Sequence, residues 1–280
     1  MAVMEKPEKI PALMLREIFL GFLATGLICT QVYASPEAAH LPDPGLALSV
    51  QAGDGNSLLT VMQTQPTIAV GSAKRASFGQ ASASEEARHV ANWAVDSGDN
   101  LNKPFVIVDK RDAKVFVFDA QGKLRGESSA LLGLAIGDHS VSGIGTKKLS
   151  AIRPEERTTP AGRFVANLDR NLKGDEILWV DYDTAISLHR VVTSVVQERR
   201  AQRLATPTPL DNRISYGCIN VPVSFYETVV SPAFTGTNGI VYVLPETRTA
   251  REVFGSYDVQ ERARLRIASQ AAPVVADSPR

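Results

Sequence analysis

The sequence predicts a mostly β fold, a sandwich or barrel with a few short helices, between about residues 101 and 246 of the 280-residue chain. Short runs of β-branched and aromatic residues recur through this region, as half-buried or buried strands require. Asp-, Gly- and Pro-containing turn signals separate these runs. Helical signals are few and short, so we expect sheets to dominate.

The strands follow one another at short spacing. Residues 105–108 and 115–118 are β-rich runs separated by the polar turn 109–112, and a second turn at 119–122 predicts a meander. Thr159-Pro-Ala-Gly162 has Pro and Gly where a tight turn prefers them. This turn leads into a strand at 163–166, and further strands are expected at 177–180, 185–189 and 240–244.

Helices are expected in three places. Residues 191–204 form the longest helical stretch of the domain, and a shorter helix opens at Pro222, a residue suited to the first helical position. A short helix is expected at 85–95, within an otherwise low-complexity spacer at 35–100 that is rich in Ala, Ser, Gly, Gln and Pro before residue 84. Residues 247–280 are expected to form a helical or disordered tail that frays from Ser269.

Residues 1–34 resemble a signal peptide. The apolar run at 18–32 has the length of a signal core, Arg16 precedes it, and Val32-Tyr-Ala34 predicts cleavage before Ser35. The alternative is an uncleaved anchor, which would tether the protein to a membrane, and a start at Met14 would give a more ordinary signal. Both interpretations predict export, to the periplasm or the cell wall.

Composition excludes some functions. The formal net charge is zero, so we expect no nucleic-acid partner, which would require a basic surplus. Four scattered histidines and the one cysteine of the expected mature chain show no ligand spacing, so neither a metal nor another cofactor is expected.

Cys218 is the strongest functional candidate, because a lone thiol in an exported protein is a liability unless it performs chemistry. It follows Gly in a turn before Pro222, which distinguishes it from the buried cysteine of an apolar core. His189 is the candidate base. In Ala185-Ile-Ser-Leu-His189, strand alternation puts Ser187 and His189 on the face opposite the apolar residues, although a core histidine is the alternative.

The order of these motifs resembles the L,D-transpeptidase catalytic-domain family of bacterial cell-wall enzymes. The resemblance rests on a strand meander, the turn at 159–162, a strand ending in His189, and Ser215-Tyr-Gly-Cys-Ile-Asn220, and it covers residues 103–245. It implies a β-sandwich or barrel and a cysteine acyltransferase acting on peptidoglycan stem peptides. It also implies roles in peptidoglycan biosynthesis, cell wall organisation and cell shape.

The resemblance assigns the remaining site residues. His189 would activate Cys218, and backbone N–H groups of Tyr216, Gly217 and Cys218 would stabilise the oxyanion. Ser215 would hydrogen-bond within this loop or to substrate. Asn220 would fix the loop after the nucleophile or contact substrate. Arg213 is a candidate clamp for a substrate carboxylate, with an ordinary surface arginine as the alternative.

The sequence departs from the family in two respects. Tyr216 stands where the family usually has histidine, and tyrosine carries no positive charge at neutral pH. The interval between His189 and Cys218 is also longer than usual, and the extra residues are expected to form a lid or a groove wall. Three functions therefore stay open: an L,D-transpeptidase, an L,D-carboxypeptidase that hydrolyses the same thioester, and a non-catalytic peptidoglycan-binding protein.

Overall fold

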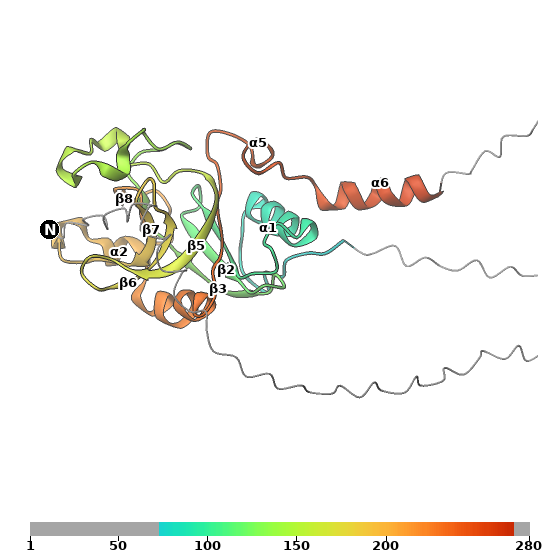
Figure 1. Cartoon of the computed structure of the whole chain (residues 1–280), viewed down its shortest axis with the longest axis horizontal. Helices are drawn as coiled ribbons and strands as arrows, with labels where there is room; N and C mark the ends of the chain where they lie inside the picture. Colours follow the sequence, from blue (N-terminus) through green and yellow to red (C-terminus); the bar gives the residue numbers. More distant parts are fainter. Residues whose placement is uncertain (1–72, 272–280) are drawn as a thin grey trace, which may run out of the picture. The chain divides into compact units, whose positions relative to one another are not determined.

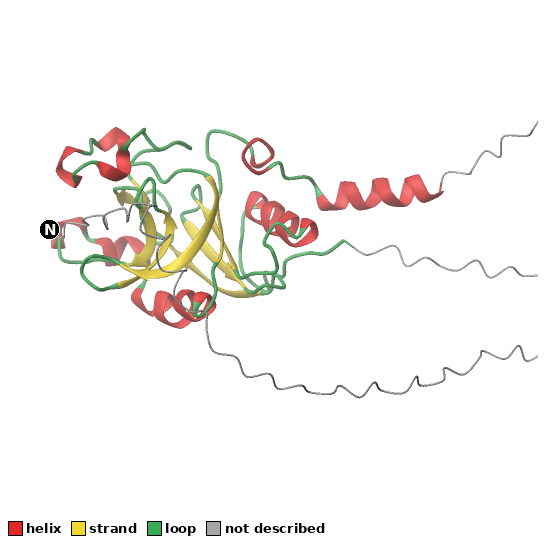
Figure 2. Cartoon of the chain, in the orientation of Figure 1, coloured by secondary structure: helices red, strands yellow, loops and turns green. Residues whose placement is uncertain are grey.

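A computed structural model describes residues 73–271, and within this range strands form the centre and short helices the periphery (Figures 1 and 2). The main sheet has eight strands in the order β3-β2-β1-β10-β5-β6-β7-β9, and a second sheet pairs β4 with β8. The main strands are β1 (Phe105–Asp109), β2 (Lys114–Phe118), β3 (Leu124–Ser129), β5 (Gly162–Arg170), β6 (Glu176–Asp181), β7 (Ile186–Arg190), β9 (Ile219–Val221) and β10 (Gly239–Val243). The short pair is β4 (Leu132–Gly133) and β8 (Arg213–Ser215).

The main sheet is nearly closed into a barrel. Most neighbours are antiparallel, but β1 pairs with β10 and β7 with β9 in parallel. An isolated bridge joins Leu131, just beyond β3, to Asn220 in β9, with N–H···O distances of 2.8 and 2.9 Å. This bridge connects the two ends of the strand order and satisfies part of an otherwise open edge.

The central strands are buried on both faces, because each face packs against a different core. The valines of β1, β2 and β10 point into the barrel, where they form one cluster with residues of β6, β7 and β9. The aromatic and large aliphatic residues that alternate with them form a second cluster beneath α1 (Glu85–Ser97). Strand periodicity therefore sorts valine to one side of the sheet and aromatic residues to the other.

The mostly β prediction is confirmed, and so are the six strands expected from the sequence, with ends that shift by a few residues. The sequence did not predict β3, β4, β8 or β9. Strand β3 contains no β-branched residue, and the other three strands have only two or three residues each. It also did not predict the single 3-10 turns between residues 144 and 156.

The predicted spacer is wrong over its last part. The expected helix is present as α1, with Ser84 as its N-cap and Gly98 ending it in the left-handed conformation. However, Phe78 is only 4% exposed and packs edge-on against Phe116 and Phe118 of β2. Residues 73–100 thus belong to the folded domain, because one aromatic anchor and one helix face bury enough apolar surface to order them. The earlier residues, including the expected signal segment, lie outside the described range.

The predicted helix at 191–204 is largely wrong. Residues 191–195 have no regular structure, a 3-10 turn η5 spans Val196–Glu198, and helix α2 covers only Arg200–Ala205. Four β-branched residues from Val191 to Val195 disfavour a helix, and Arg199 adopts a left-handed conformation that separates η5 from α2.

The helix expected at Pro222 is present as a continuous helical segment. Pro222 is its N-cap, and α3 (Val223–Phe225), the π-helical turn η6 (Tyr226–Val230) and α4 (Ser231–Phe234) follow without a break. Phe225, Tyr226, Val230 and Phe234 of this segment pack into the barrel cluster, on the other side of the sheet from α1.

The carboxy-terminal region is only partly a tail. It contains α5 (Ala250–Phe254) and α6 (Val259–Ala271), and both Ala250 and Val259 are buried in the cluster beneath α1. The helix continues through Ser269, where fraying was expected.

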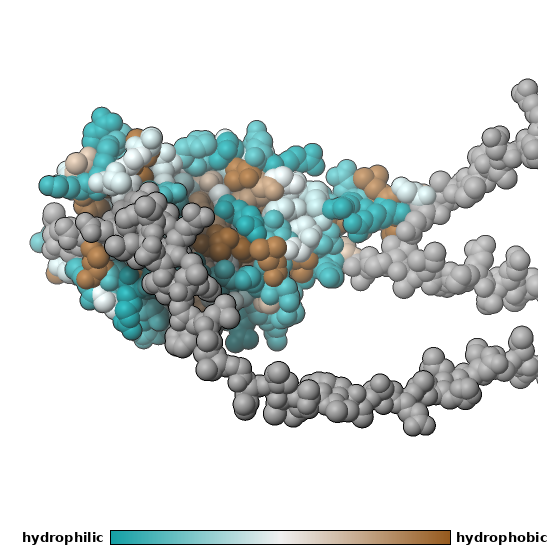
Figure 3. Space-filling model, in the orientation of Figure 1, coloured by the Kyte–Doolittle hydropathy of each residue, from teal (hydrophilic) through white to brown (hydrophobic). Residues whose placement is uncertain are grey.

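The face of the domain seen in Figure 3 is mainly hydrophilic with scattered hydrophobic patches. Among residues 73–271, no helix has both the length and the apolar character needed to cross a bilayer.

Candidate active site

Two neighbouring parallel strands bring the candidate catalytic residues together. In the register of β7 and β9, Leu188 lies opposite Ile219 and His189 opposite Asn220. Leu188 and Ile219 point into the barrel core. Since successive side chains alternate, Ser187, His189, Cys218 and Asn220 share the other face. Ser187 Oγ donates to Cys218 Sγ across the pair at 3.6 Å.

Cys218 and His189 interact electrostatically. Burial opposes ionisation of the thiol, but its hydrogen bond and charge interaction with His189 hold the pKa of Cys218 below its ordinary value. Burial likewise opposes protonation of the imidazole, and the interaction with Cys218 outweighs it and raises the pKa of His189. The two shifts favour a thiolate–imidazolium pair, the state in which a cysteine is nucleophilic.

The residue that follows His189 in β7 fixes the orientation of the imidazole. Nδ1 lies 2.7 Å from the backbone oxygen of Arg190, and a carbonyl only accepts, so Nδ1 carries a proton. Nε2 is then the ring nitrogen that can exchange a proton with the thiol. The Arg190 side chain extends away to Glu227 and over the ring of Tyr226. The partner of the imidazole is thus a backbone group, which side-chain patterns do not reveal.

The loop before Cys218 is held by hydrogen bonds between its own residues. Ser215 Oγ donates to the Cys218 carbonyl at 2.6 Å and accepts from the Gly217 N–H at 3.1 Å. The Gly217 N–H therefore has a partner within the loop, and its use as an oxyanion donor stays a prediction. Gly217 has a φ of +127°, and a Cβ there would lie 2.8 Å from the Thr158 oxygen and 2.7 Å from Ile186 Cδ1. Only glycine fits this position.

Thr159 connects the loop to the rest of the fold. Its hydroxyl donates to the Gly217 carbonyl at 2.7 Å and accepts from the Gly133 N–H at 2.9 Å, and Thr159 is fully buried. The sequence identified Thr159 only as part of a turn. Its role in supporting the loop depends on a contact across 58 positions of the chain.

Asn220 holds the carbonyl of Cys218. Its Nδ2 donates to the Cys218 oxygen at 3.2 Å and lies 3.5 Å from His189 Nε2, while its Oδ1 accepts from Arg200 Nη1 at 2.8 Å. The Arg200 side chain is only 12% exposed. The long interval between His189 and Cys218 therefore folds this arginine back onto the site.

Arg213 belongs to a buried ionic cluster. Its guanidinium binds both oxygens of Glu246 and donates to the Lys110 carbonyl at 2.9 Å. Lys110 Nζ is 2.9 Å from Asp138, and both side chains are inaccessible to solvent. Burial opposes the charge on Asp138, but hydrogen bonds from Thr247, Glu246 and Lys110 hold its pKa well below its usual range. These partners occupy donor groups of the Arg213 guanidinium. The role of Arg213 as a clamp for a substrate carboxylate stays a prediction.

The side chain of Arg157 stacks on the ring of Tyr216. The guanidinium carbon of Arg157 lies 3.9 Å from the ring centroid, well within the range of a cation–π contact. The neutral aromatic side chain next to Gly217 therefore has a permanent positive charge beside it.

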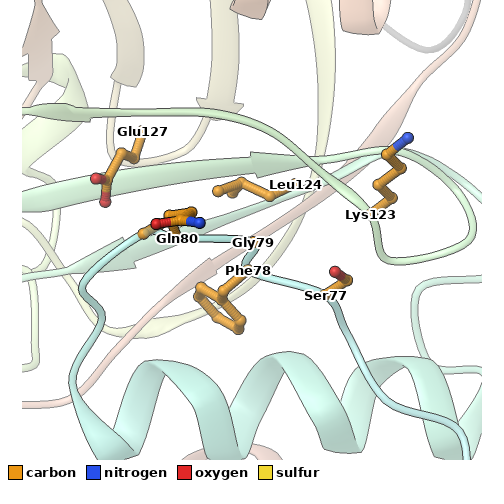
Figure 4. A pocket seen from close by; sticks show the side chains of 8 residues that line it. Ser77, Phe78, Gly79, Gln80, Lys123, Leu124 and Glu127 are labelled. Carbon is orange, nitrogen blue, oxygen red and sulfur yellow. The ribbon is translucent and has the colours of Figure 1, made fainter.

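No group of three or more His, Cys, Asp or Glu side chains within residues 73–271 is arranged to hold a metal ion. A surface pocket lies between the segment 77–81 and β3, with Phe78, Leu124 and Glu127 among its lining residues (Figure 4). It shares no residue with the cluster around Cys218, so it has no place in the candidate chemistry.

Comparisons of the sequence with known proteins found no match, whereas comparison of the structure found several. No family model and no curated protein matches the chain. Among solved structures it is similar to the catalytic domain of the E. faecium L,D-transpeptidase, with 18% identity over 51% of this chain and 98% of that domain, at a TM-score of 0.31. L,D-transpeptidase domains are the family that the sequence motifs resemble.

Two longer proteins also match. An L,D-transpeptidase from Mycobacterium tuberculosis is 15% identical over 50% of this chain and 57% of its own length, with a TM-score of 0.32. The helical cell shape determining protein Pgp2 from Campylobacter jejuni is 15% identical over 57% of this chain and 52% of its own, with a TM-score of 0.35. The matched region thus spans little more than half of each of these two chains.

Proposed function

We propose that this protein is an exported L,D-transpeptidase, a cysteine acyltransferase that acts on peptidoglycan stem peptides. Cys218 is the nucleophile and His189 the base. The observation that carries the proposal is the register of β7 and β9, which places His189 and Cys218 on the same face of the sheet. Their interaction lowers the pKa of the thiol and raises that of the imidazole. A purely structural cysteine would have its pKa raised by burial.

The proposed reaction begins with attack of the thiolate on the carbonyl of an L-configured stem residue. The Sγ–C bond forms as the C–N bond to the terminal D-residue breaks, and the His189 imidazolium delivers its proton to the departing amine. An amine of a second stem then attacks the thioester. The neutral imidazole takes the proton of that amine, the C–S bond breaks, and a cross-link forms while the thiolate is regenerated.

The supporting residues fit this sequence of steps. Ser215 and Asn220 both bind the Cys218 carbonyl, at 2.6 and 3.2 Å, and so limit movement of the backbone that carries the nucleophile. Preorganisation of this kind matters, because a displacement of about 1 Å at a reacting atom can lower the rate about 100-fold.

A thiol-reactive acylating agent tests the proposal. Incubation with a carbapenem should add the mass of one acyl group to the intact protein, and peptide mapping should locate it on Cys218. Cys218→Ser is the matched control and should give no stable adduct. Absence of an adduct on the folded natural protein would contradict both enzymatic functions and favour a peptidoglycan-binding role.

Product analysis with purified muropeptides then separates the two enzymatic functions. Transfer produces a cross-linked dimer from two stems. If water resolves the thioester instead, the product is a monomer that lacks its terminal D-residue, and the protein is an L,D-carboxypeptidase. A trimmed monomer without dimer, at millimolar acceptor stem, would overturn the transpeptidase assignment and leave the Cys218 chemistry intact.

A further inference from the structure

Arg157 has an unusual environment for a surface-loop cation. It is half-buried and stacks on Tyr216, and its Nε and Nη2 donate to the Ile152 carbonyl at 3.4 and 3.2 Å. Within residues 73–271 no carboxylate lies within ion-pair distance of its guanidinium, and its Nη1 has no acceptor. A partly desolvated cation without a counter-ion is a favourable site for an anionic ligand.

Two other cations of the same loop, Lys147 and Arg153, are paired. Lys147 Nζ lies 2.6 Å from Glu156, and Arg153 contacts both Glu155 and Glu156 at 3.2 and 3.6 Å. Glu156 is nevertheless the residue next to Arg157 in the chain. The acidic residues of this loop thus pair with Lys147 and Arg153 and leave the guanidinium on Tyr216 without an acidic partner.

The backbone beside Arg157 lies directly against the nucleophile loop. The Thr158 carbonyl approaches Gly217 so closely that a Cβ on Gly217 would be 2.8 Å from it, and the next residue, Thr159, donates to the Gly217 carbonyl at 2.7 Å. Only Gly217 separates Tyr216 from Cys218. Side chain and backbone of the Arg157 segment therefore both contact the two residues that precede the nucleophile.

We propose that Arg157, held on the Tyr216 ring, binds the terminal carboxylate of the donor stem peptide and thereby selects the donor. The inference rests on the proposed acyl transfer. In that reaction the departing D-residue carries a free carboxylate, separated from the breaking C–N bond by a single carbon. The Nη1 N–H groups are free to donate to it, and the ring fixes the plane of the guanidinium, so little side-chain freedom is lost on binding.

The test compares two donor substrates that differ only in charge: a synthetic tetrapeptide stem with a free terminal carboxylate and the same stem with a terminal carboxamide. The kcat/KM for acylation of Cys218 is measured for each by intact-protein mass spectrometry. We expect the natural protein to prefer the carboxylate by roughly 10- to 100-fold, the usual range for a charge-assisted hydrogen bond.

Four variants resolve the origin of that preference. Arg157→Gln should reduce the ratio to about one, Arg157→Lys should retain part of it, and Tyr216→Phe, which keeps the ring, should retain most. Lys148→Gln is the matched control, because Lys148 is an exposed cation of the same loop and has no ion-pair partner within the described residues. Its ratio should equal that of the natural protein.

Each outcome bears on one conclusion. A natural protein that is acylated equally by both stems overturns the carboxylate inference and leaves the acyl transfer standing. An Arg157→Gln variant that loses the same factor on both stems also overturns it, since Arg157 then only supports the loop. If neither stem acylates Cys218 of the natural protein, the proposed function itself fails.

Discussion

The proposed reactivity of Cys218 depends on one neighbour, His189. Burial alone would raise the pKa of the thiol, whereas the interaction with His189 lowers it, and the second effect prevails. The imidazole is oriented by the Arg190 carbonyl, 2.7 Å from Nδ1, which directs Nε2 to the thiol side of the ring. The chemistry at this site is therefore a property of the pair rather than of either residue.

The first prediction concerns pH. Because the pKa of Cys218 is lowered and that of His189 raised, the thiolate should persist below the ordinary thiol pKa of about 8.5. His189→Gln removes the stabilising charge and leaves the burial, so the midpoint of Cys218 alkylation should move above about 8.5. Iodoacetamide labelling rates between about pH 5 and 10 measure both midpoints.

The exposed His139 supplies the control for this experiment. His139→Gln changes the same residue type outside the site and should leave the alkylation midpoint where it is in the natural protein. Equal midpoints for the natural protein and His189→Gln would show that His189 does not stabilise the thiolate.

The second prediction concerns Gly217. Gly217→Ala introduces a methyl group 2.8 Å from the Thr158 oxygen at a φ of +127°, so the loop must shift. We expect a loss of roughly 1–3 kcal/mol in the free energy of unfolding and much slower acylation by a carbapenem. Gly236→Ala is the control, since Gly236 also has a positive φ but a Cβ there meets nothing within 4 Å. Comparable effects of the two substitutions would mean that the close packing at Gly217 is unimportant.

At the scale of elements, the site depends on the parallel pairing of β7 with β9. This register places the His189 position opposite Asn220 and leaves Leu188 and Ile219 to pack in the barrel. The segment between the two strands is not a simple helical lid. It is irregular at residues 191–195, η5 follows, and α2 then directs Arg200 onto Asn220.

The third prediction tests this contribution of α2. Arg200→Gln removes the charge-assisted hydrogen bond that fixes the Asn220 amide, so acylation should slow about tenfold, the effect of roughly 1.4 kcal/mol. Carbapenem acylation rates provide the measurement. Arg199→Gln is the control, because Arg199 is exposed and has no part in the contact.

A double-mutant cycle shows whether Arg200 acts through Asn220. If it does, Arg200→Gln should have little further effect in an Asn220→Ala background. Additive effects of the two substitutions would instead indicate that Arg200 influences the site by another route, such as its charge near His189.

At the scale of the whole molecule, a buried ionic cluster joins distant segments. Lys110 follows β1, Asp138 lies in the loop after β4, and Glu246 follows β10. Lys110 Nζ also donates to the carbonyl of Thr159, the residue whose hydroxyl holds the Gly217 loop. The cluster is thus connected to the nucleophile loop through a fully buried threonine.

The fourth prediction follows from this burial. Lys110→Met removes the cation closest to the solvent-inaccessible Asp138 carboxylate and leaves the more distant Arg248 Nε at 3.8 Å. This loss should lower the free energy of unfolding by about 3–5 kcal/mol in urea titrations. Arg153→Ala breaks a solvent-exposed pair and should change it by less than about 1 kcal/mol. A loss for Lys110→Met as small as that of the control would contradict a structural role for the cluster.

The sequence alone determined the local features of this protein. Alternating and β-rich runs predicted six strands, because these signals depend on neighbours in the chain. The motifs around Cys218 and His189 indicated a nucleophile and a base, and these roles stay proposals. Tertiary structure alone decided that Phe78 anchors residues 73–100 to the domain, that Arg200 reaches Asn220, and that Arg157 stacks on Tyr216. Such contacts join residues far apart in sequence and leave no periodic signal, so only the packed fold reveals them.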